Sequence, residues 1–207
     1  MPRSPRRRLL ALAVLLLAGC ASPDERFARH VTRGEEFAQA GQRDEALLEY
    51  SSALKIQPDD AEINQRVGDL LRRGGSLVEA ALFYRSAHRL DPQRLDAAMA
   101  EADLIRFSDK ERAGELLADA LERAPDAPVV QRTRAEFALV RGNIPEALEA
   151  ARKAIELEPN GVQNWAQLGR VYKGRIKKRE RKQLELGDDA YRDAIEAYER
   201  ADELAGG

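Results

Sequence analysis

Apolar residues along most of this chain return every three or four positions, in stretches that glycine or proline interrupts. This period places apolar side chains on one face of an α-helix, whereas a half-buried strand needs strict alternation. Prolines close four successive stretches, at Pro58, Pro92, Pro125 and Pro159. The steps between them are 92 minus 58, 125 minus 92 and 159 minus 125, or 34, 33 and 34 residues. The pattern therefore predicts an all-α chain built from repeated helix pairs.

The segment 27–60 shows how one helix pair is expected to form. Gly41 can take the positive φ angle that ends a first helix, and Asp44 places a carboxylate near the start of the second. Ala46 is small where the two helices cross, while Tyr50 fills the wider gap between them. Matching residues define an array over 27–207 with five repeats, at about 27–60, 61–94, 95–127, 128–161 and 162–207.

Two repeats depart from this plan. The third is one residue shorter, most simply in the turn around Ser108, which replaces the glycine of the other turns. In the fourth, Ala151 stands where the first repeat has Tyr50. A smaller side chain there leads us to expect closer packing of the two helices.

The last repeat contains the pattern W-x2-L-G-x2-Y, from Trp165 to Tyr172. Its large residues recur at three- and four-residue steps and share one helix face, while Gly169 lets a second backbone approach closely. This motif and the period of 34 resemble the tetratricopeptide repeat family. The resemblance implies an all-α solenoid of about five helix-turn-helix repeats.

The last repeat is also longer than the others. From Tyr172 to Ala194 the chain takes 194 minus 172, or 22, residues, where Phe37 to Ala46 takes 46 minus 37, or 9. The added segment has strong helix formers and no proline, and Gly187 followed by acids suits a helix end and a new start. We therefore expect an overlong first helix, from about Val162 to Leu186.

The first residues have the layout of an export signal. Arg3 to Arg8 are basic, and Leu9 to Ala18 form an apolar run that is too short to span a membrane. Leu17 to Cys20 resembles the lipobox of bacterial lipoproteins, which implies removal of 1–19 and diacylation of the Cys20 thiol. The alternative is an ordinary signal peptide that ends by chance in a small residue.

The lipoprotein resemblance also implies a location. Ala21, rather than an aspartate, follows the cysteine, which favours the outer membrane over the inner one, with the array facing the periplasm. Residues 20–26 would form a short tether, and we expect Asp24 to cap the first helix.

Charge and composition exclude several functions. The formal net charge is -2, and without the four arginines of residues 1–19 it is -2 minus 4, or -6, which is not the charge of a general nucleic-acid binder. Cys20 is the only cysteine, and neither His30 nor His88 has an acid or thiol at metal-ligand spacing. No phosphate-cradling loop or nucleophile elbow is present. We expect no enzyme activity, cofactor or metal.

The family resemblance implies where a partner protein or peptide would bind. First helices of such repeats line a concave groove, which suits an extended peptide or a partner helix. The carboxylate clamp of some relatives is absent, because Val31 and Glu35 occupy its places. We expect a small apolar patch at Met99, Phe107, Leu139 and Val140, unless the groove is merely solvated and the array is a spacer. The candidate partner-binding residues are Asp69, Arg72, Arg73, Met99, Asp103, Arg106, Phe107, Arg132, Glu136 and Arg170.

A basic run, 173–182, lies in the overlong helix. It holds seven lysines and arginines and one acid, Glu180. A solvated helix is the first interpretation, an anionic envelope surface or acidic partner the second, and nucleic acid the least favoured. No aromatic residue is interleaved with these cations, which argues against stacking on single strands.

Together these features resemble bacterial lipoproteins of the repeat family, including those that assist pilus and secretin assembly. The first hypothesis is a membrane-anchored scaffold that binds a protein or peptide in an envelope complex. The second is a structural or regulatory partner of peptidoglycan or exopolysaccharide export machinery. Ile195, Tyr198 and Leu204 recur at helical spacing with no capping helix after them, so we also expect self-association through the C-terminal repeat.

Overall fold

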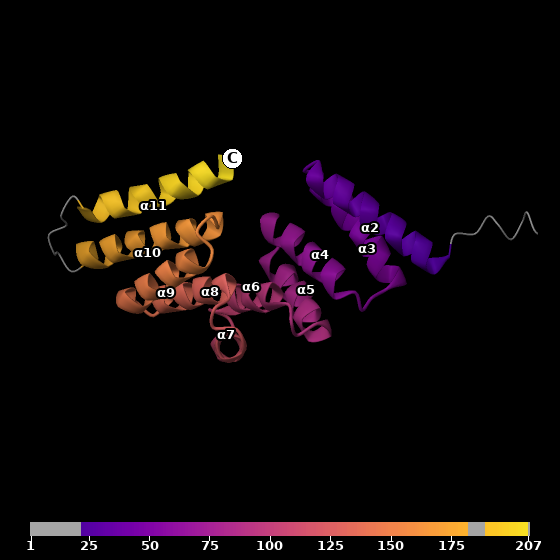
Figure 1. Ribbon diagram of the computed structural model, residues 1–207. Coiled ribbons are helices and arrows are strands. Elements are labelled where there is room, and N and C mark those ends of the chain that lie inside the picture. The colour runs from indigo at the N-terminus through magenta and orange to yellow at the C-terminus, as the bar shows by residue number, and fades with distance from the viewer. Residues whose placement is uncertain (1–21, 182–188, 207) are drawn as a thin grey trace, which may run out of the picture. The chain divides into compact units, whose positions relative to one another are not determined.

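The computed structural model describes residues 22–181 and 189–206, and these residues form ten α-helices and no strand. Consecutive helices fold back on one another in pairs, which confirms the all-α repeat architecture (Figure 1). In order they are α2 (Pro23–Gln39), α3 (Arg43–Ile56), α4 (Ala61–Arg73), α5 (Leu77–Leu90), α6 (Leu95–Ile105), α7 (Lys110–Arg123), α8 (Pro128–Val140), α9 (Ile144–Leu157), α10 (Val162–Arg181) and α11 (Asp189–Gly206).

The helices belong to two compact units that divide after Leu90. Unit 1 contains α2 to α5, and unit 2 contains α6 to α11. In unit 1 the core joins both repeats, since Tyr50 and Ala53 of α3 cluster with Ile63 and Val67 of α4. An unbroken apolar face along each helix pair accounts for this packing, because each pair can bury that face only against a neighbour.

The first helix begins earlier than the sequence predicts. Ser22 Oγ accepts a hydrogen bond from the Glu25 N–H at 3.1 Å, and the Glu25 carboxylate accepts one from the Ser22 N–H at 2.8 Å. This reciprocal capping box satisfies two backbone donors at once, so Ser22 is the cap and Pro23 is the first helical residue. The expectation that Asp24 caps the helix is wrong, and the tether between Cys20 and the array is correspondingly shorter.

Glycine in the first helix makes room for a tyrosine ring of the second. A Cβ atom on Gly34 would stand 2.5 Å from the ring of Tyr50, nearer than real side-chain contacts come. The expectation that Gly169 admits a second backbone is therefore corrected, because the group that approaches it is a ring. The pairing occurs in three repeats, with Gly34 against Tyr50, Gly68 against Tyr84 and Gly169 against Tyr198.

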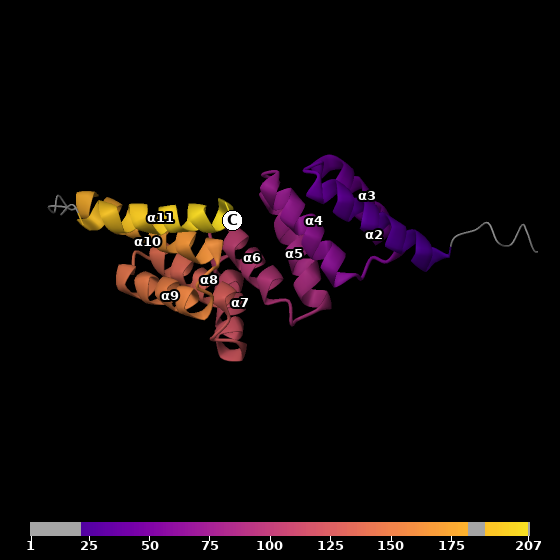
Figure 2. The same ribbon diagram turned by 45° about the horizontal axis from the view of Figure 1, so that its top comes forward.

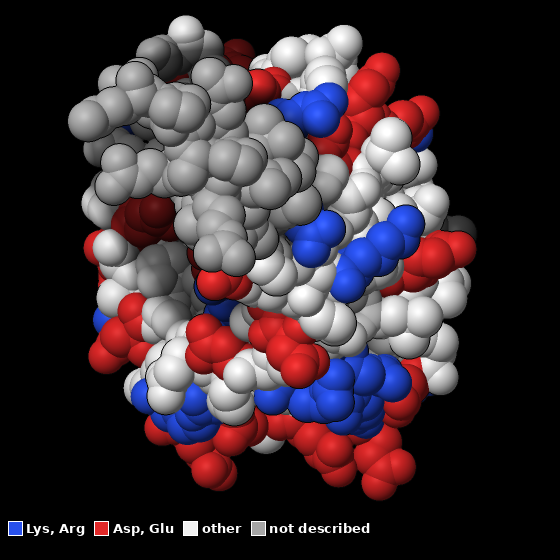
Figure 3. Space-filling model, turned by 90° about the vertical axis from the view of Figure 1, so that its right-hand side faces the viewer, with Lys and Arg blue, Asp and Glu red and all other residues white. Residues whose placement is uncertain are grey.

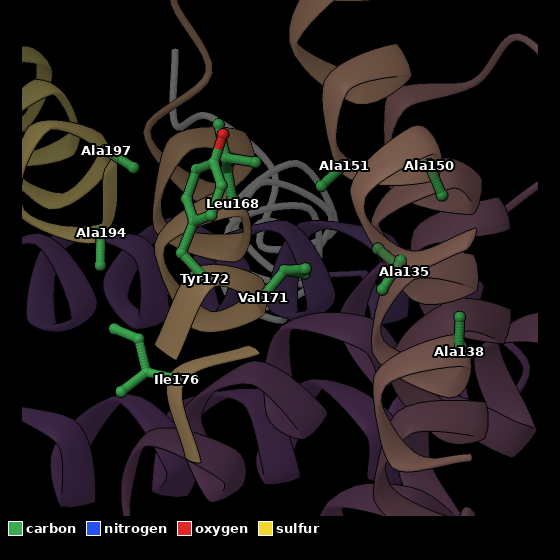
Figure 4. Packing of buried hydrophobic residues seen from close by; sticks show 11 residues of the cluster. Ala135, Ala138, Ala150, Ala151, Leu168, Val171, Tyr172, Ile176, Ala194 and Ala197 are labelled. Carbon is green, nitrogen blue, oxygen red and sulfur yellow. The ribbon is translucent and has the colours of Figure 1, made fainter. Parts of the chain in front are cut away.

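The third repeat is shortened in its first helix, so the expected loss in the turn around Ser108 is wrong. Helix α6 has 11 residues, against 13 in α4 and α8, whereas the turn 106–109 is one residue longer than the turns 74–76 and 141–143. Asp109 caps α7 after this turn. In the fourth repeat Ala151 is fully buried among alanines of α8 and α9. Figure 4 shows Leu168, Val171 and Tyr172 of α10 between these alanines and those of α11.

Helix α10 is longer than any other first helix. It has 20 residues, against 11 to 17 in α2, α4, α6 and α8, and it contacts α8, α9 and α11 (Figure 2). This confirms a long first helix in the last repeat, while its expected end at Leu186 lies outside the described residues.

The export signal and Cys20 also lie outside the described residues. Within residues 22–181 and 189–206, no helix combines the length and apolarity that crossing a bilayer requires.

Candidate partner-binding surfaces

The first helices of unit 2 carry polar side chains that are joined to one another. Arg106 caps the end of α6, and its Nη2 lies 3.6 Å from Glu136 Oε1 of α8. Gln167 of α10 donates to the same carboxylate at 3.2 Å. Gln167 also accepts a hydrogen bond from Arg170. We call these four residues the polar row. Stacking of the repeats places equivalent turns side by side, so the row links three successive first helices.

The polar row neutralises much of its own charge. Arg106 donates to Asp103 at 2.7 Å as well as facing Glu136, and its guanidinium lies 4.7 Å from the ring centre of Phe107. Five predicted binding residues thus meet within one cluster of contacts: Asp103, Arg106, Phe107, Glu136 and Arg170. Gln167, which joins them, was not predicted, because a single glutamine on a helix carries no signal in the sequence.

Arg132 binds a residue of the next repeat, Asn164. Its guanidinium donates to Asn164 Oδ1 at 3.1 Å, and the Asn164 amide in turn donates to the carbonyls of Ala154 and Glu158 at 3.1 and 2.9 Å. Asn164 is fully buried, so these bonds satisfy polar groups where α9 ends and α10 begins. Arg132 therefore supports the junction between two repeats.

The expected apolar patch is only partly present. Met99 is 1% exposed and presents no surface to a partner, so its assignment as a binding residue is wrong. Its long apolar side chain is better accommodated in the core, where it fills space between helices. Leu139 is half-buried against the unit 2 core, whereas Phe107 and Val140 remain exposed at 63% and 45%.

Unit 1 has a pocket of about 400 Å³ between its two first helices. Arg66 lies within it and donates to Glu35 and, at 2.5 Å, to Glu62. Partial burial acts to lower the pKa of Arg66, but hydrogen bonds with these carboxylates and with Tyr50 outweigh it and raise the pKa above its usual value. The pocket is lined by Glu35, Ala38, Gln39, Tyr50, Arg66, Asp69, Leu70 and Arg73.

Two of the predicted binding residues, Asp69 and Arg73, line this pocket, and a third, Arg72, is adjacent to Arg73 in the sequence. Asp69 accepts a hydrogen bond from the Tyr84 hydroxyl at 2.6 Å, while Arg73 lines the pocket and Arg72 is exposed. Burial of the Tyr84 ring and its bond to Asp69 raise the pKa of the phenol well above its usual value. Tyr84 therefore stays a hydrogen-bond donor at neutral pH, and Asp69 is held in place.

Unit 2 has a larger pocket, of about 560 Å³, beside α10. Arg170, Lys173 and Lys177 are spaced at three and four residues, so they follow one side of that helix. Gly174 lies on the same side and meets Leu139, which closes the pocket from α8. We call this the basic pocket, and it is lined by Leu139, Gly142, Ile144, Arg170, Lys173, Gly174, Lys177 and Tyr198.

The basic run divides between two sides of α10. Arg175 donates to Asp193 of α11 at 2.8 Å and lies 5.0 Å from the ring centre of Tyr172, so it holds the last helix pair together. Lys173 and Lys177 line the basic pocket. The side chains from Lys178 to Lys182 lie outside the described residues.

The C-terminal repeat presents part of the apolar face that we expected. Ile195 and Tyr191 are exposed at 54% and 45%, and Leu204 is half-buried. Tyr198, however, packs its ring on Gly169 of its own repeat. Assigning Tyr198 to a self-association surface is therefore corrected, since its ring is already engaged within the chain.

His30 has an acidic partner that sequence spacing did not indicate. Its Nδ1 lies 2.6 Å from the Glu49 carboxylate of α3, and Arg33 binds the other oxygen at 2.9 Å. Glu49 is buried, and one cation and one imidazole satisfy it. Over residues 22–181 and 189–206, His, Cys, Asp and Glu side chains form no group of three that would hold a metal ion.

The face of the protein that carries α2 and α3 has mixed charge (Figure 3). On the side of α2 and α3 that Figure 3 shows, lysine and arginine side chains are interspersed with aspartate and glutamate. A nucleic-acid surface would instead gather cations on one face.

Comparison with known proteins agrees with this architecture. The profile of the family described as tetratricopeptide repeat matches residues 31–94 and 102–162. The mouse protein O-mannosyl-transferase TMTC3 is 28% identical over 145 residues, which are 62% of this chain but only 16% of that protein.

Two solved structures share the fold. MamA from Desulfovibrio magneticus RS-1 has a TM-score of 0.58 at 18% identity, covering 87% of this chain and 95% of MamA. PilF from Pseudomonas aeruginosa has a TM-score of 0.61 at 18% identity, covering 88% of this chain and 78% of PilF. At this identity the likeness is one of fold.

Proposed function

Because this chain belongs to the tetratricopeptide repeat family, whose fold is a protein-interaction scaffold, we propose that it is a lipid-anchored scaffold of the bacterial envelope. Its first helices bind a segment of a partner protein, and a lipid on Cys20 holds it at the outer membrane, facing the periplasm. It acts by non-covalent binding, in the assembly of an envelope, pilus or secretion complex.

The observation that carries the proposal is the polar row. Arg106, at the end of α6, and Glu136 of α8 keep 23% and 15% of their side chains exposed, and the buried Gln167 of α10 links Glu136 to the exposed Arg170. An extended segment offers backbone donors and acceptors along its length, so it can bond to these exposed groups on successive repeats.

A lipid on Cys20 would have a short tether to the first helix. Pro23 is the first residue of α2, so Cys20 is 23 minus 20, or 3, residues from the helix. At roughly 3.5 Å per residue this reaches only about 10 Å. A diacylated Cys20 would therefore hold unit 1 close to the lipid surface.

The assignment to pilus or secretion assembly rests on the resemblance to pilus-biogenesis lipoproteins, and the fold of PilF is compatible with it. A structural or regulatory role with peptidoglycan or exopolysaccharide export machinery is the alternative, because the same kind of groove serves both. Mannosyl transfer is not proposed, since the matched part of TMTC3 is a small fraction of that protein.

Site-specific photo-crosslinking in membranes tests the binding surface. A photoreactive residue replaces Gln163, which is exposed on the first helix α10, and in a matched variant it replaces Glu122, which is exposed on the second helix α7. We expect one discrete adduct with an envelope protein at position 163 and none at position 122.

The identity of the adduct separates the two roles. A pilus or secretin component supports the first, and an enzyme of peptidoglycan or polysaccharide export supports the alternative. Equal labelling at both positions, or labelling at neither, would contradict a partner bound along the first helices.

A further inference from the structure

The basic pocket has a lining of one charge sign, and it shares Arg170 with the polar row. Of the eight residues that line it, three are cations and none is an acid. In the polar row, by contrast, Arg106 faces both Asp103 and Glu136. On the other side of α10, Arg175 is matched by Asp193. The lining of this pocket therefore carries only positive formal charge, from Arg170, Lys173 and Lys177.

The other half of the pocket is apolar. Leu139 of α8, Ile144 of α9 and Tyr198 of α11 line the pocket together with the cations, and the lack of a side chain on Gly174 lets Leu139 approach α10 closely. Its volume of about 560 Å³ lies in the range of small-ligand sites. It can take a leucine or phenylalanine side chain whose neighbours remain at the charged rim.

We propose that the basic pocket docks a segment of the partner protein in which one large apolar side chain is flanked by carboxylates. This rests on the proposed function, because it assigns the chemistry of the guest. The apolar side chain enters between Leu139 and Ile144, and the flanking carboxylates pair with Arg170, Lys173 and Lys177.

The apolar lining distinguishes this guest from other anions. Nucleic acid and anionic lipid headgroups would use the three cations, but they would leave Leu139 and Ile144 without an apolar partner. An acidic segment with an apolar residue uses both halves, and the apolar half contributes affinity that salt does not screen. The pocket therefore favours a protein segment.

Fluorescence anisotropy with the purified full chain tests the assignment. The probe is a labelled peptide with phenylalanine between pairs of aspartate and glutamate, compared with peptides in which serine replaces phenylalanine or lysines replace the acids. We expect the acidic phenylalanine peptide to bind at least about tenfold more tightly than either relative, since it alone satisfies both halves of the pocket.

Two charge-reversal variants locate the site. Lys173→Glu changes the pocket, whereas Lys110→Glu makes the same change in net charge at the exposed start of α7. We expect Lys173→Glu to weaken the acidic phenylalanine peptide by about tenfold or more and Lys110→Glu to leave it within about twofold. Both variants must unfold at the same temperature as the parent chain. Lys173→Ala removes the charge without reversing it, so it should weaken peptide binding by an intermediate factor.

Several outcomes would overturn the assignment. Equal affinity for the phenylalanine and serine peptides would show that the pocket binds no apolar side chain. An equal loss of peptide affinity in Lys173→Glu and Lys110→Glu would show a diffuse effect of net charge. Vesicles containing phosphatidylglycerol that bind more tightly than the peptide, and that need Lys173, would assign the pocket to a lipid surface. A single-stranded oligonucleotide that does the same would assign it to nucleic acid. The two proposals can fail separately. If the photo-crosslink from position 163 persists in the Lys173→Glu variant, and the acidic phenylalanine peptide does not bind this variant or binds neither protein, the scaffold function stands and only this guest is wrong.

Discussion

The ring of Tyr198 lies against Gly169, so closely that a Cβ atom on the glycine would stand 2.8 Å from the ring carbons. The same relationship joins Gly34 to Tyr50 in unit 1. The size of the residue at the glycine position therefore matches the size of the residue that faces it on the second helix. The fourth repeat is consistent with this, because Ala151 replaces the tyrosine and Ala135, fully buried, replaces the glycine.

Replacing Gly169 with alanine should destabilise unit 2. The added methyl cannot fit without displacing the Tyr198 ring, and overpacking of this kind costs about 1–3 kcal/mol. Gly114→Ala is the matched control, since nothing lies within 4 Å of its added Cβ and alanine favours a helix by about 0.5–1 kcal/mol. Urea unfolding measures both. A stabilised Gly169→Ala would contradict the pairing, and combining it with Tyr198→Ala should make the two costs non-additive.

Introducing a charge at Ala80 should break the second repeat. Ala80 is fully buried in α5, so Ala80→Glu places an unpaired carboxylate in the core of unit 1 and costs several kcal/mol, of the order of 3–5. Val78→Glu, two residues away and 75% exposed, should change the free energy of unfolding by less than about 0.5 kcal/mol. Circular-dichroism melts that coincide for the two variants would show that this helix face is assigned wrongly.

The Tyr84 hydroxyl should make stability depend on alkaline pH. Its pKa in the folded chain is raised above the unfolded value of about 10, so its contribution is complete below pH 10 and is lost as the pH rises further. At neutral pH, Tyr84→Phe should cost about 1–2 kcal/mol, because the bond to Asp69 is removed.

Unfolding of both proteins between pH 8 and about pH 12 checks the sign. We expect the stability difference between wild type and Tyr84→Phe to be constant at first and to shrink above about pH 10. A difference that grows with pH would mean that ionisation of Tyr84 favours the folded state.

Ile195 should mediate self-association through α11. It is 54% exposed beside Tyr191, and covering such residues releases bound water. We expect light scattering of the purified chain to show association that Ile195→Glu reduces, with no change in thermal stability. Tyr198→Glu, in contrast, should lower the melting temperature, because its ring packs on Gly169. A parent chain that is monomeric at all concentrations would remove this surface.

Cys20→Ala should release the protein from the membrane or leave its leader uncleaved. Without the thiol there is no atom to acylate, and the described helices include none that could hold the chain in a bilayer. Ala21→Ser keeps the thiol and should stay in the membrane fraction. Membrane fractionation and the mass of the N-terminal peptide measure both effects. A Cys20→Ala protein that is still acylated and membrane-bound would contradict the proposal that the lipid is attached to Cys20.

Local features of the sequence were sufficient to predict the helix pairs. Gly41 takes a φ angle of 73°, and α3 ends at Ile56, two residues before Pro58, because backbone geometry at glycine and proline acts within a few residues. The period of 34 then placed the remaining pairs, since the same turns recur with the same spacing. These constraints are short-ranged, so they can be read along the chain.

Only the tertiary structure decided which predicted binding residues can meet a partner. Met99 and Phe107 follow the same family pattern, yet the first is buried and the second is exposed. Arg132 is bound to Asn164, 32 residues later, and Glu136 meets Gln167 after 31 residues. Such contacts depend on how neighbouring repeats pack, and a helix period fixes the face of a residue but not what a distant helix places opposite it. The basic pocket arises in the same way, where α10 passes Leu139 and Ile144.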